Sequence, residues 1–180
     1  GKFMTIDSYG GGFQVYNVAT DAWLASPAQP TTARKEAALV YYDGKVYYYG
    51  GDNGGSGTNT WGIYDVGTNS WDETAYNGSP QARKLHCGAA PQSGGGAGKI
   101  YFYGGYRADT SNVGHMDVYD ISSNTFGTAI TGGISAKWHG KLEATNDGYL
   151  YQWGGLIGNV TDDPKVWKFN IATSTWSIVN

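Results

Sequence analysis

The chain has 180 residues, enough for one sizeable domain, and only 15% of them are charged while another 15% are aromatic. This composition excludes a disordered chain, and the abundance of Gly, Asn, Thr and Tyr disfavours a helical protein. The net charge of -3 and the lack of any Lys/Arg cluster longer than a dipeptide argue against nucleic acid as a partner. No apolar run approaches the roughly 20 residues that cross a bilayer, so membrane insertion is not expected.

Taken in chain order, the sequence predicts short strands that fall into four groups. Apolar residues occupy alternate positions, as at Trp61 and Ile63, which is typical of strands with one buried face. Asp-Gly pairs at 43–44 and 147–148 separate strand-like runs, as hairpin turns do. The predicted strands of the first unit are 2–6, 13–16 and 22–24, those of the second are 37–42, 45–49, 60–64 and 70–74, and the last two units contain strands from about 86 to 128 and from about 141 to 179.

Two sequence elements recur at intervals of about fifty residues, which indicates an internal repeat. VYYYGG ends at Gly51, IYFYGG at Gly105 and LYQWGG at Gly155. A second element follows each of them and contains two aromatic residues seven positions apart. These aromatic pairs are Tyr16 and Trp23, Tyr64 and Trp71, Tyr119 and Phe126, and Phe169 and Trp176. Four matches at one spacing indicate four copies of one structural unit, and the first copy has no Gly-Gly block ahead of it.

This order of an apolar strand, Gly-Gly, Tyr and Trp resembles the kelch repeat over nearly the whole chain. In the third unit Arg83 and His86 also match the Arg-x-x-His that often precedes the first strand of that repeat, whereas the second unit has Ala37 in place of the His. The resemblance implies an all-β fold, a kelch-type β-propeller of about four blades, each an antiparallel four-stranded sheet. It implies one domain over residues 1–180, with units at roughly 2–25, 34–74, 83–128 and 137–179 and with the first blade incomplete.

The repeated glycines and aromatic residues are expected to be structural. Glycine permits positive φ and close backbone approach where a strand ends in a crowded place. An aromatic ring buries perhaps 150–250 Å² when it packs between neighbouring sheets. We therefore expect these residues to hold the blades together rather than to contact ligands.

The sequence leaves the closure of the ring open. The first unit lacks its first strand, and the chain begins GKFMT without an initiator Met or a signal-peptide pattern. Three arrangements remain: a small four-bladed ring, a piece of a longer polypeptide, or an open arc completed by other chains, for instance two copies with about eight blades. Because an open arc would expose aromatic faces and strand edges, we expect self-association or assembly into a larger particle.

Several kinds of catalytic chemistry find no support in the sequence. The glycine-rich stretches 10–12, 50–57 and 94–98 lack the G-x-x-x-x-G-K-[ST] pattern and open no helix, so they do not indicate a phosphate site. Some kelch propellers are copper radical oxidases that resemble galactose oxidase, but this chain is much shorter and has no Tyr-His pair. We therefore predict no catalytic residue, no cofactor and no enzyme activity, with an oxidase as the least favoured alternative.

The residues that could ligate a metal do not form a recognisable set. His86 and Cys87 are adjacent and would point to opposite faces of one strand, while His115 and His139 lie in other segments. We predict no metal site and expect His86 to be packed within its repeat. Cys87 is the only cysteine, so no disulfide forms within the chain.

The loops of one face of the scaffold are the best candidates for binding, because loops on rigid scaffolds commonly carry function. In a four-stranded blade, the loops that join strands 2 and 3 emerge on the same face as those that lead into strand 1. The predicted binding residues on this face are Arg34, Asp52, Asn53, Arg83, Tyr106, Arg107, Lys137, Trp138 and His139, with Lys35, Lys84, Asp109 and Asn159 as neighbours. For Arg34 and Arg83 a structural role, tying neighbouring blades by hydrogen bonds, is nearly as well supported. Trp138 and Tyr106 break the repeat and are the preferred binding residues.

These observations predict a non-catalytic propeller module for protein–protein interaction or structural assembly, with a protein partner or a second copy of the chain. A carbohydrate-binding propeller is the alternative. The composition slightly favours an extracellular, cell-surface or virion setting, and Asn77 and Asn159 begin N-glycosylation sequons that matter only in a secreted eukaryotic protein.

Overall fold

The computed structural model describes residues 2–6, 12–107, 111–158 and 161–179, and over these ranges the chain contains strands and no helix. No helix in the described ranges is therefore long and apolar enough to cross a membrane. All pairings between the strands are antiparallel, and the strands form five open sheets. The all-β class predicted from the sequence is confirmed.

Four of the sheets follow one another in chain order, and a fifth, smaller sheet lies beside the last of them. Sheet 1 consists of β1 (Lys2–Ile6), β2 (Phe13–Asn17) and β3 (Ala22–Trp23). Sheet 2 consists of β4 (Ala38–Tyr42), β5 (Lys45–Tyr49), β6 (Trp61–Asp65) and β7 (Ser70–Asp72). Sheet 3 consists of β8 (Cys87–Ala89), β9 (Lys99–Tyr103), β10 (His115–Asp120) and β11 (Thr125–Phe126), with β12 (Ile130–Thr131) also paired to β10. Sheet 4 consists of β14 (Lys141–Ala144), β15 (Tyr149–Trp153), β18 (Val166–Asn170) and β19 (Thr175–Ile178). The small sheet consists of β13 (Lys137–Trp138), β16 (Leu156–Ile157) and β17 (Thr161–Asp162).

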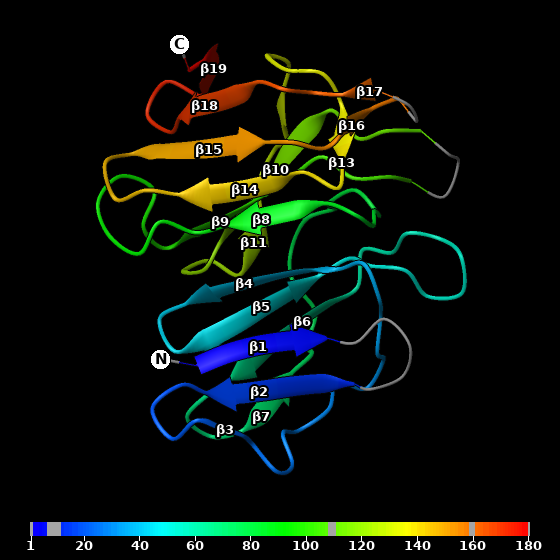
Figure 1. The fold of residues 1–180 in the computed structure, drawn as a ribbon, viewed down its shortest axis with the longest axis vertical. Helices are drawn as coiled ribbons and strands as arrows, with labels where there is room; N and C mark the ends of the chain where they lie inside the picture. The colour runs from blue at the N-terminus through cyan, green and yellow to red at the C-terminus, as the bar shows by residue number, and fades with distance from the viewer. Residues whose placement is uncertain (1, 7–11, 108–110, 159–160, 180) are drawn as a thin grey trace.

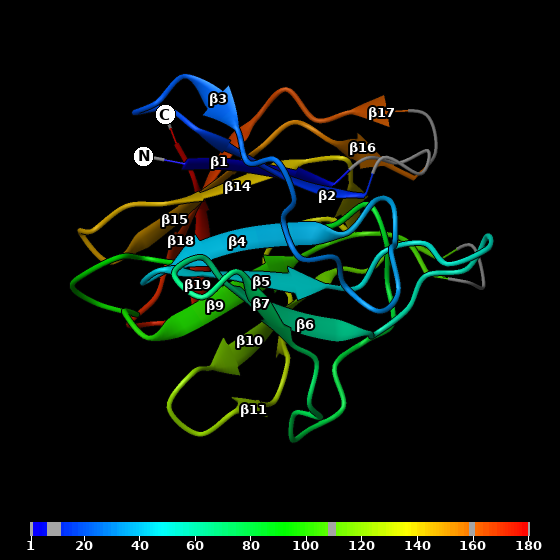
Figure 2. The same ribbon diagram turned by 90° about the horizontal axis from the view of Figure 1, so that it is seen from below.

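The four main sheets are stacked along the longest axis of the molecule, from sheets 1 and 2 at the lower end of Figure 1 to sheet 4 at the upper end. The first strands of sheets 2, 3 and 4 lie side by side, with β8 between β4 and β14 (Figure 1). In Figure 2, β10 and β11 of sheet 3 lie farther from β4 than β5 does. Sheet 1 begins with the counterpart of β5 and has no counterpart of β4 among the described residues.

Most predicted strands are confirmed to within one or two residues, and 2–6 and 45–49 match β1 and β5 at both ends. Sequence reasoning missed β12 and the small sheet, because their two-residue strands lack the repeated aromatic ring that marks the equally short β3 and β11. No strand order among the described residues closes on itself, so the structure shows separate open sheets rather than a closed barrel or ring. The interpretation of these sheets as kelch-type blades stays a prediction.

The seven-residue aromatic spacing reflects a hairpin. Tyr64 pairs across the strands with Trp71, and Tyr16, Tyr119 and Phe169 pair in the same way with Trp23, Phe126 and Trp176. At the turn, the carboxylate of Asp65 accepts hydrogen bonds from the backbone N–H groups of Gly67 and Thr68. The turn then needs one residue in the left-handed region, and Asn69 fills it with φ 53°.

The turn asparagine is also fixed by the tyrosine that opens the motif. The hydroxyl of Tyr64 donates to Oδ1 of Asn69 at 2.8 Å, and Tyr119 makes the same 2.8 Å bond to Asn124. The fourth unit has Phe169 in place of the tyrosine and Ser174 in place of the asparagine, so donor and acceptor are absent together. Because the two positions change as a pair, the hydrogen bond is a unit of the repeat.

Replacing Tyr119 with phenylalanine is expected to lower the free energy of unfolding by about 1 kcal/mol, because it leaves the Asn124 amide without this donor. Chemical denaturation measures the loss. In an Asn124→Ala background the same substitution should cost only a few tenths of a kcal/mol, because its partner is already gone. Equal losses in the two backgrounds would show that the hydroxyl stabilises the fold by some other contact.

The four main sheets are stacked face to face: one face of a sheet packs on the sheet that follows it, and the other face packs on the sheet before it, where these are present. We call these its forward and backward faces. The forward face of sheet 1 presents Phe13 to Tyr64 of sheet 2, with the ring centroids 4.6 Å apart. Trp61 on the forward face of sheet 2 packs on Tyr119 of sheet 3 at 4.5 Å. Met116 of sheet 3 and Phe169 of sheet 4 lie together in the third core cluster. The three clusters confirm that the repeated rings of the last three units join neighbouring sheets.

The Gly-Gly pairs are also explained by this packing, and all of their glycines have positive φ. A Cβ on Gly50 would come within 3 Å of the carbonyl oxygen of Arg83 in the next unit, and Gly104 faces the carbonyl of Lys137 in the same way. The second glycine packs on its own unit, as Gly51 does. The first glycine therefore permits the contact between units and the second permits the contact within a unit.

Candidate functional site

The loops that follow β5, β9 and β15 all emerge on one side of the molecule, at the right of Figures 1 and 2. We call this side the loop face. In each of the last three units three short segments pair there, as antiparallel bridges in units 2 and 3 and as the small sheet in unit 4. The paired residues are Lys35, Asp52 and Gly57 in unit 2, Lys84, Tyr106 and Asn112 in unit 3, and Trp138, Leu156 and Asp162 in unit 4. The loop face therefore has a repeated backbone, and only its side chains differ between units.

One residue in each of units 2, 3 and 4 takes a left-handed conformation at this face, and hydrogen bonds between these residues link the three units. Glu36, Leu85 and His139 have φ values of 61°, 58° and 60°. The N–H of Leu85 donates to the carbonyl of Glu36 at 2.8 Å, and the N–H of His139 donates to the carbonyl of Leu85 at 2.9 Å. Residues other than glycine adopt this conformation at a cost of order 1–3 kcal/mol, so three in equivalent places indicate a backbone that the surrounding structure imposes.

At the boundary between units 2 and 3 the loop face is charged. The ammonium of Lys84 lies 2.8 Å from Asp52 and 3.7 Å from Glu36, while Lys35 lies 3.8 Å from the same Asp52 carboxylate. Burial raises the pKa of Asp52, but the hydrogen bonds from Lys84 and from the N–H of Gly55 outweigh burial and hold the pKa below its usual range. Asp52 is buried and accepts hydrogen bonds within this loop, whereas Asn53 is exposed at its tip.

At the next boundary the same positions carry aromatic rings. Tyr106 and Trp138 are equivalent to Asp52 and Lys84, and their ring centroids are 5.6 Å apart. The ring of His139 lies 4.5 Å from that of Trp138, and Trp138 donates its indole N–H to the carbonyl of Gly158 at 2.7 Å. We call Tyr106, Trp138 and His139 the aromatic cluster. Two of its rings are half-buried and His139 is exposed, so the cluster is both positioned and accessible.

Arg34 is placed beneath this face rather than on it. It is almost fully buried, with its guanidinium 3.9 Å from the centroid of the Tyr48 ring. Nε donates to the carbonyl of Gly50 at 2.7 Å, and a terminal nitrogen donates to that of Thr60. The guanidinium thus supplies a donor to the Gly50 carbonyl and a second donor to that of Thr60, which also accepts from the N–H of Gly50.

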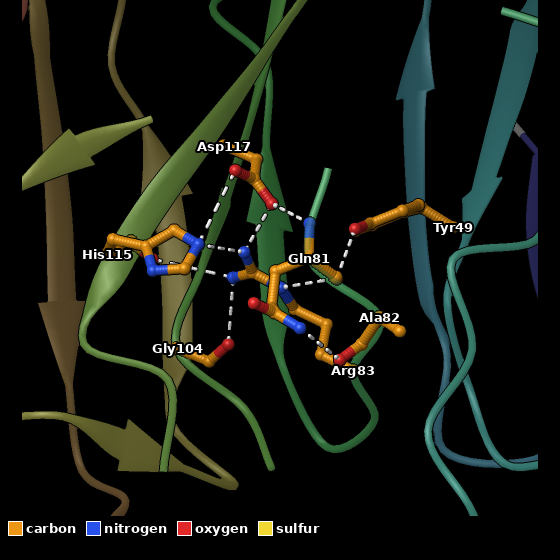
Figure 3. A network of polar contacts seen from close by, with 7 residues as sticks. All are labelled: Tyr49, Gln81, Ala82, Arg83, Gly104, His115 and Asp117. Atoms are coloured by element: carbon orange, nitrogen blue, oxygen red, sulfur yellow. Dashed lines mark hydrogen bonds and ion pairs between the residues drawn. The ribbon is translucent and has the colours of Figure 1, made fainter. Parts of the chain in front are cut away.

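Arg83 does the same in unit 3 and is fully buried (Figure 3). It donates to the carbonyl of Gly104 at 2.9 Å and forms an ion pair with the buried carboxylate of Asp117. Asp117 also accepts from the N–H of Gln81, and the carbonyl of Gln81 accepts from the hydroxyl of Tyr49 in sheet 2. Figure 3 shows this network spanning the boundary between sheets 2 and 3.

Lys137 occupies the equivalent position in unit 4 and is also buried. Its ammonium donates to the Gln152 side chain at 2.7 Å and pairs with Asp163, which accepts from the indole of Trp167 as well. Burial lowers the pKa of Lys137, and Asp163 opposes that shift. Arg34, Arg83 and Lys137 thus contact groups inside the fold. This agrees with the structural role considered for the two arginines, and none of the three side chains is part of the exposed surface of the loop face.

Two of the residues that could ligate a metal, His86 and Cys87, contact different groups inside the fold. The His86 ring is buried 5.1 Å from the ring of Tyr49, and burial together with Arg83 lowers its pKa well below the usual range. The thiol of Cys87 donates to the carbonyl of Tyr103, and burial raises its pKa to about 12. Within the described ranges no three His, Cys, Asp or Glu side chains are grouped as metal ligands.

The other residues named in the sequence analysis do not form a second group. Arg107 is half-buried beside the aromatic cluster, with its N–H bonded to the carbonyl of Ser111. Asp109 and Asn159 lie outside the described residues. Asn77 is exposed and bridges to Thr125 away from the Gly-Gly loops.

Sequence reasoning missed Glu36, Leu85, Asp117 and Asp163. A column-by-column comparison of the units would have placed Glu36, Leu85 and His139 at one position, directly after Lys35, Lys84 and Trp138. The two buried aspartates had no comparable signal, because they lie at different places in their units. No protein-family model and no curated protein matches the chain.

Proposed function

We propose that this chain is an arc of kelch-type propeller blades and serves as a non-catalytic module for protein–protein interaction or structural assembly. Support for the architecture comes from the repeated strand order, the Gly-Gly contacts between units, and the ring clusters that join each sheet to the next. The matching positions of Arg34, Arg83 and Lys137 agree with one repeating blade.

The observation that carries the binding proposal is the aromatic cluster. The charged side chains at the other boundary pair with one another, and the buried cations serve backbone carbonyls and carboxylates. Tyr106, Trp138 and His139 instead present partly exposed rings on an imposed backbone, beside Arg107. Tyrosine, tryptophan and arginine are the residues that dominate protein–protein contacts, so a peptide segment of a partner protein is the expected ligand.

A non-catalytic role fits the state of the potential nucleophile and base. A thiol with a pKa of about 12 is almost entirely protonated at neutral pH, and the buried His86 ring is held neutral. An extracellular, cell-surface or virion setting remains the expectation from composition. Carbohydrate binding is the alternative, because exposed Trp and Tyr rings also stack on sugars.

Selection from a displayed peptide library, run beside a glycan array, tests the proposal. We expect peptides that bind the wild-type chain and lose at least about 30-fold in affinity for the Trp138→Ala variant, the usual size of a hot-spot loss. The matched control is Tyr41→Ala, an exposed aromatic residue beside the β4–β5 turn at the opposite end of its blade. Sugar binding with the same dependence on Trp138 would favour the alternative. Binding that ignores Trp138, or no binding of either kind, would contradict the role of this face.

A further inference from the structure

The forward face of sheet 4 has the design of an interface between blades but has no sheet on it. Tyr49 and Tyr103 occupy one repeat position and are 0% and 2% exposed, whereas Trp153 at the same position is 40% exposed. Val166 pairs with Trp153 across the strands, as Trp61 and Met116 pair with Tyr49 and Tyr103. Trp61 is 4% exposed and Met116 is 0% exposed, but Val166 is 39% exposed. Two apolar repeat positions that are buried in sheets 2 and 3 are therefore exposed in sheet 4.

The backbone of unit 4 is open at the same place. Gly50 and Gly104 each pack against a carbonyl of the following unit. Gly154 is their counterpart, and a Cβ built on it meets nothing within 4 Å among the described residues. Gly154 therefore lacks the contact with a neighbouring carbonyl that Gly50 and Gly104 make.

The backward face of sheet 1 is the complementary open surface. In the other three units the closing ring of the hairpin packs on the preceding sheet, as Phe126 packs on Trp61 at 5.3 Å and Trp176 on Tyr103 at 5.3 Å. Trp23 is their counterpart and is 57% exposed, touching Tyr16 of its own hairpin. A backward face covers each buried forward face in this chain, and the backward face of sheet 1 is therefore available to cover another.

The charges at the two ends complement each other. Between sheets 2 and 3 a groove of about 430 Å³ is lined by Ile63 from one side and Asn124 from the other. The counterpart of Ile63 on the open forward face is Lys168, whose ammonium lies 3.7 Å from the centroid of the Tyr149 ring. The counterpart of Asn124 on the open backward face is Asp21. If the two faces met as the internal ones do, a lysine and an aspartate would share the groove.

We propose that the forward face of sheet 4 binds the backward face of sheet 1 of a second copy of this chain, head to tail. This inference rests on the proposed assembly function and names its partner and its surfaces. Such an interface is heterologous, so it closes a ring of copies where the rotation between them allows and forms longer chains where it does not.

Mass measurement by sedimentation over a range of concentrations tests the proposal. Wild-type protein should exceed the 19.3 kDa of one chain, and Trp153→Asp or Trp23→Asp should weaken self-association by at least about 30-fold. A mixture of the two variants should form a one-to-one dimer, because each retains the face that the other has lost. If like faces paired instead, one variant would still associate alone and mixing would add nothing, which would overturn the head-to-tail arrangement.

Charge reversal provides a second test that does not remove a ring. Lys168→Glu and Asp21→Lys should each weaken association, and mixing the two variants should restore it, since both contacts then pair opposite charges. Lys99→Glu, an exposed lysine away from both end faces, is the matched control and should associate like the wild type.

The outcomes separate this inference from the proposed function. Association that survives all of these substitutions would overturn the named surfaces and leave the assembly function standing. A wild-type chain that stays at 19.3 kDa would overturn the pairing of copies, and only binding of a partner peptide at the loop face would then support the proposed function.

Discussion

Replacing Arg83 with alanine is expected to lower the free energy of unfolding by about 3–5 kcal/mol, because it leaves a buried carboxylate without its counter-charge. Asp117 is only 3% exposed and pairs with Arg83, while its other neighbour, the His115 ring at 3.5 Å, has a pKa that burial and Arg83 lower. The carbonyl of Gly104 loses its donor in the same variant, where Gly104 packs against the carbonyl of Lys137 in the next unit. Urea denaturation followed by tryptophan fluorescence measures the loss.

Two further variants distinguish a buried charge from lost packing. The double variant Arg83→Met with Asp117→Leu keeps apolar volume and removes both charges, so it should recover most of the loss. Lys35→Ala removes a half-exposed lysine 3.8 Å from Asp52 and should cost less than 1 kcal/mol. If Arg83→Ala were as mild as Lys35→Ala, the network of Figure 3 would not be a stabilising link between the sheets.

Arg83 and Lys137 show what the sequence could not predict. The repeat places a cation at both positions, just as the alternation of apolar residues and the Gly-Gly and aromatic spacing predicted the main strands. Their burial depends on carboxylates distant in sequence: Asp117 lies on a strand of sheet 3, and Asp163 lies in a loop after β17. A long-range partner that differs between units leaves no periodic signal, so the sequence could not distinguish a buried cation from an exposed one.

Only part of the candidate site could be predicted from the sequence. Trp138 and Tyr106 stood out because they break the repeat, and the structure brings them together. The imposed backbone around them was not predictable, since the left-handed conformation of Leu85 follows from its bond to Glu36 of another unit rather than from its side chain. Local propensity disfavours leucine there, and the packing of the units overrides that preference.

Trp61→Ala is the second substitution for which we expect a large effect, a loss of about 3–5 kcal/mol. The indole is 4% exposed and packs on Tyr119 at 4.5 Å and on Phe126 at 5.3 Å, so alanine would open a cavity between sheets 2 and 3. Met116→Ala at the equivalent position of sheet 3 should cost about 2–5 kcal/mol for the same reason. Thermal and chemical denaturation measure both.

Val166 supplies the matched control, because it holds the same repeat position but is 39% exposed. In a Trp153→Asp background, which is expected to keep the chain monomeric, Val166→Ala should change the free energy of unfolding by no more than about 0.5 kcal/mol. A steep loss at Trp61 and Met116 with none at Val166 would mean that the position is stabilising only where another sheet covers it. A loss at Val166 comparable to that at Met116 would show that sheet 4 is already covered within one chain, and the forward face would then be no open interface.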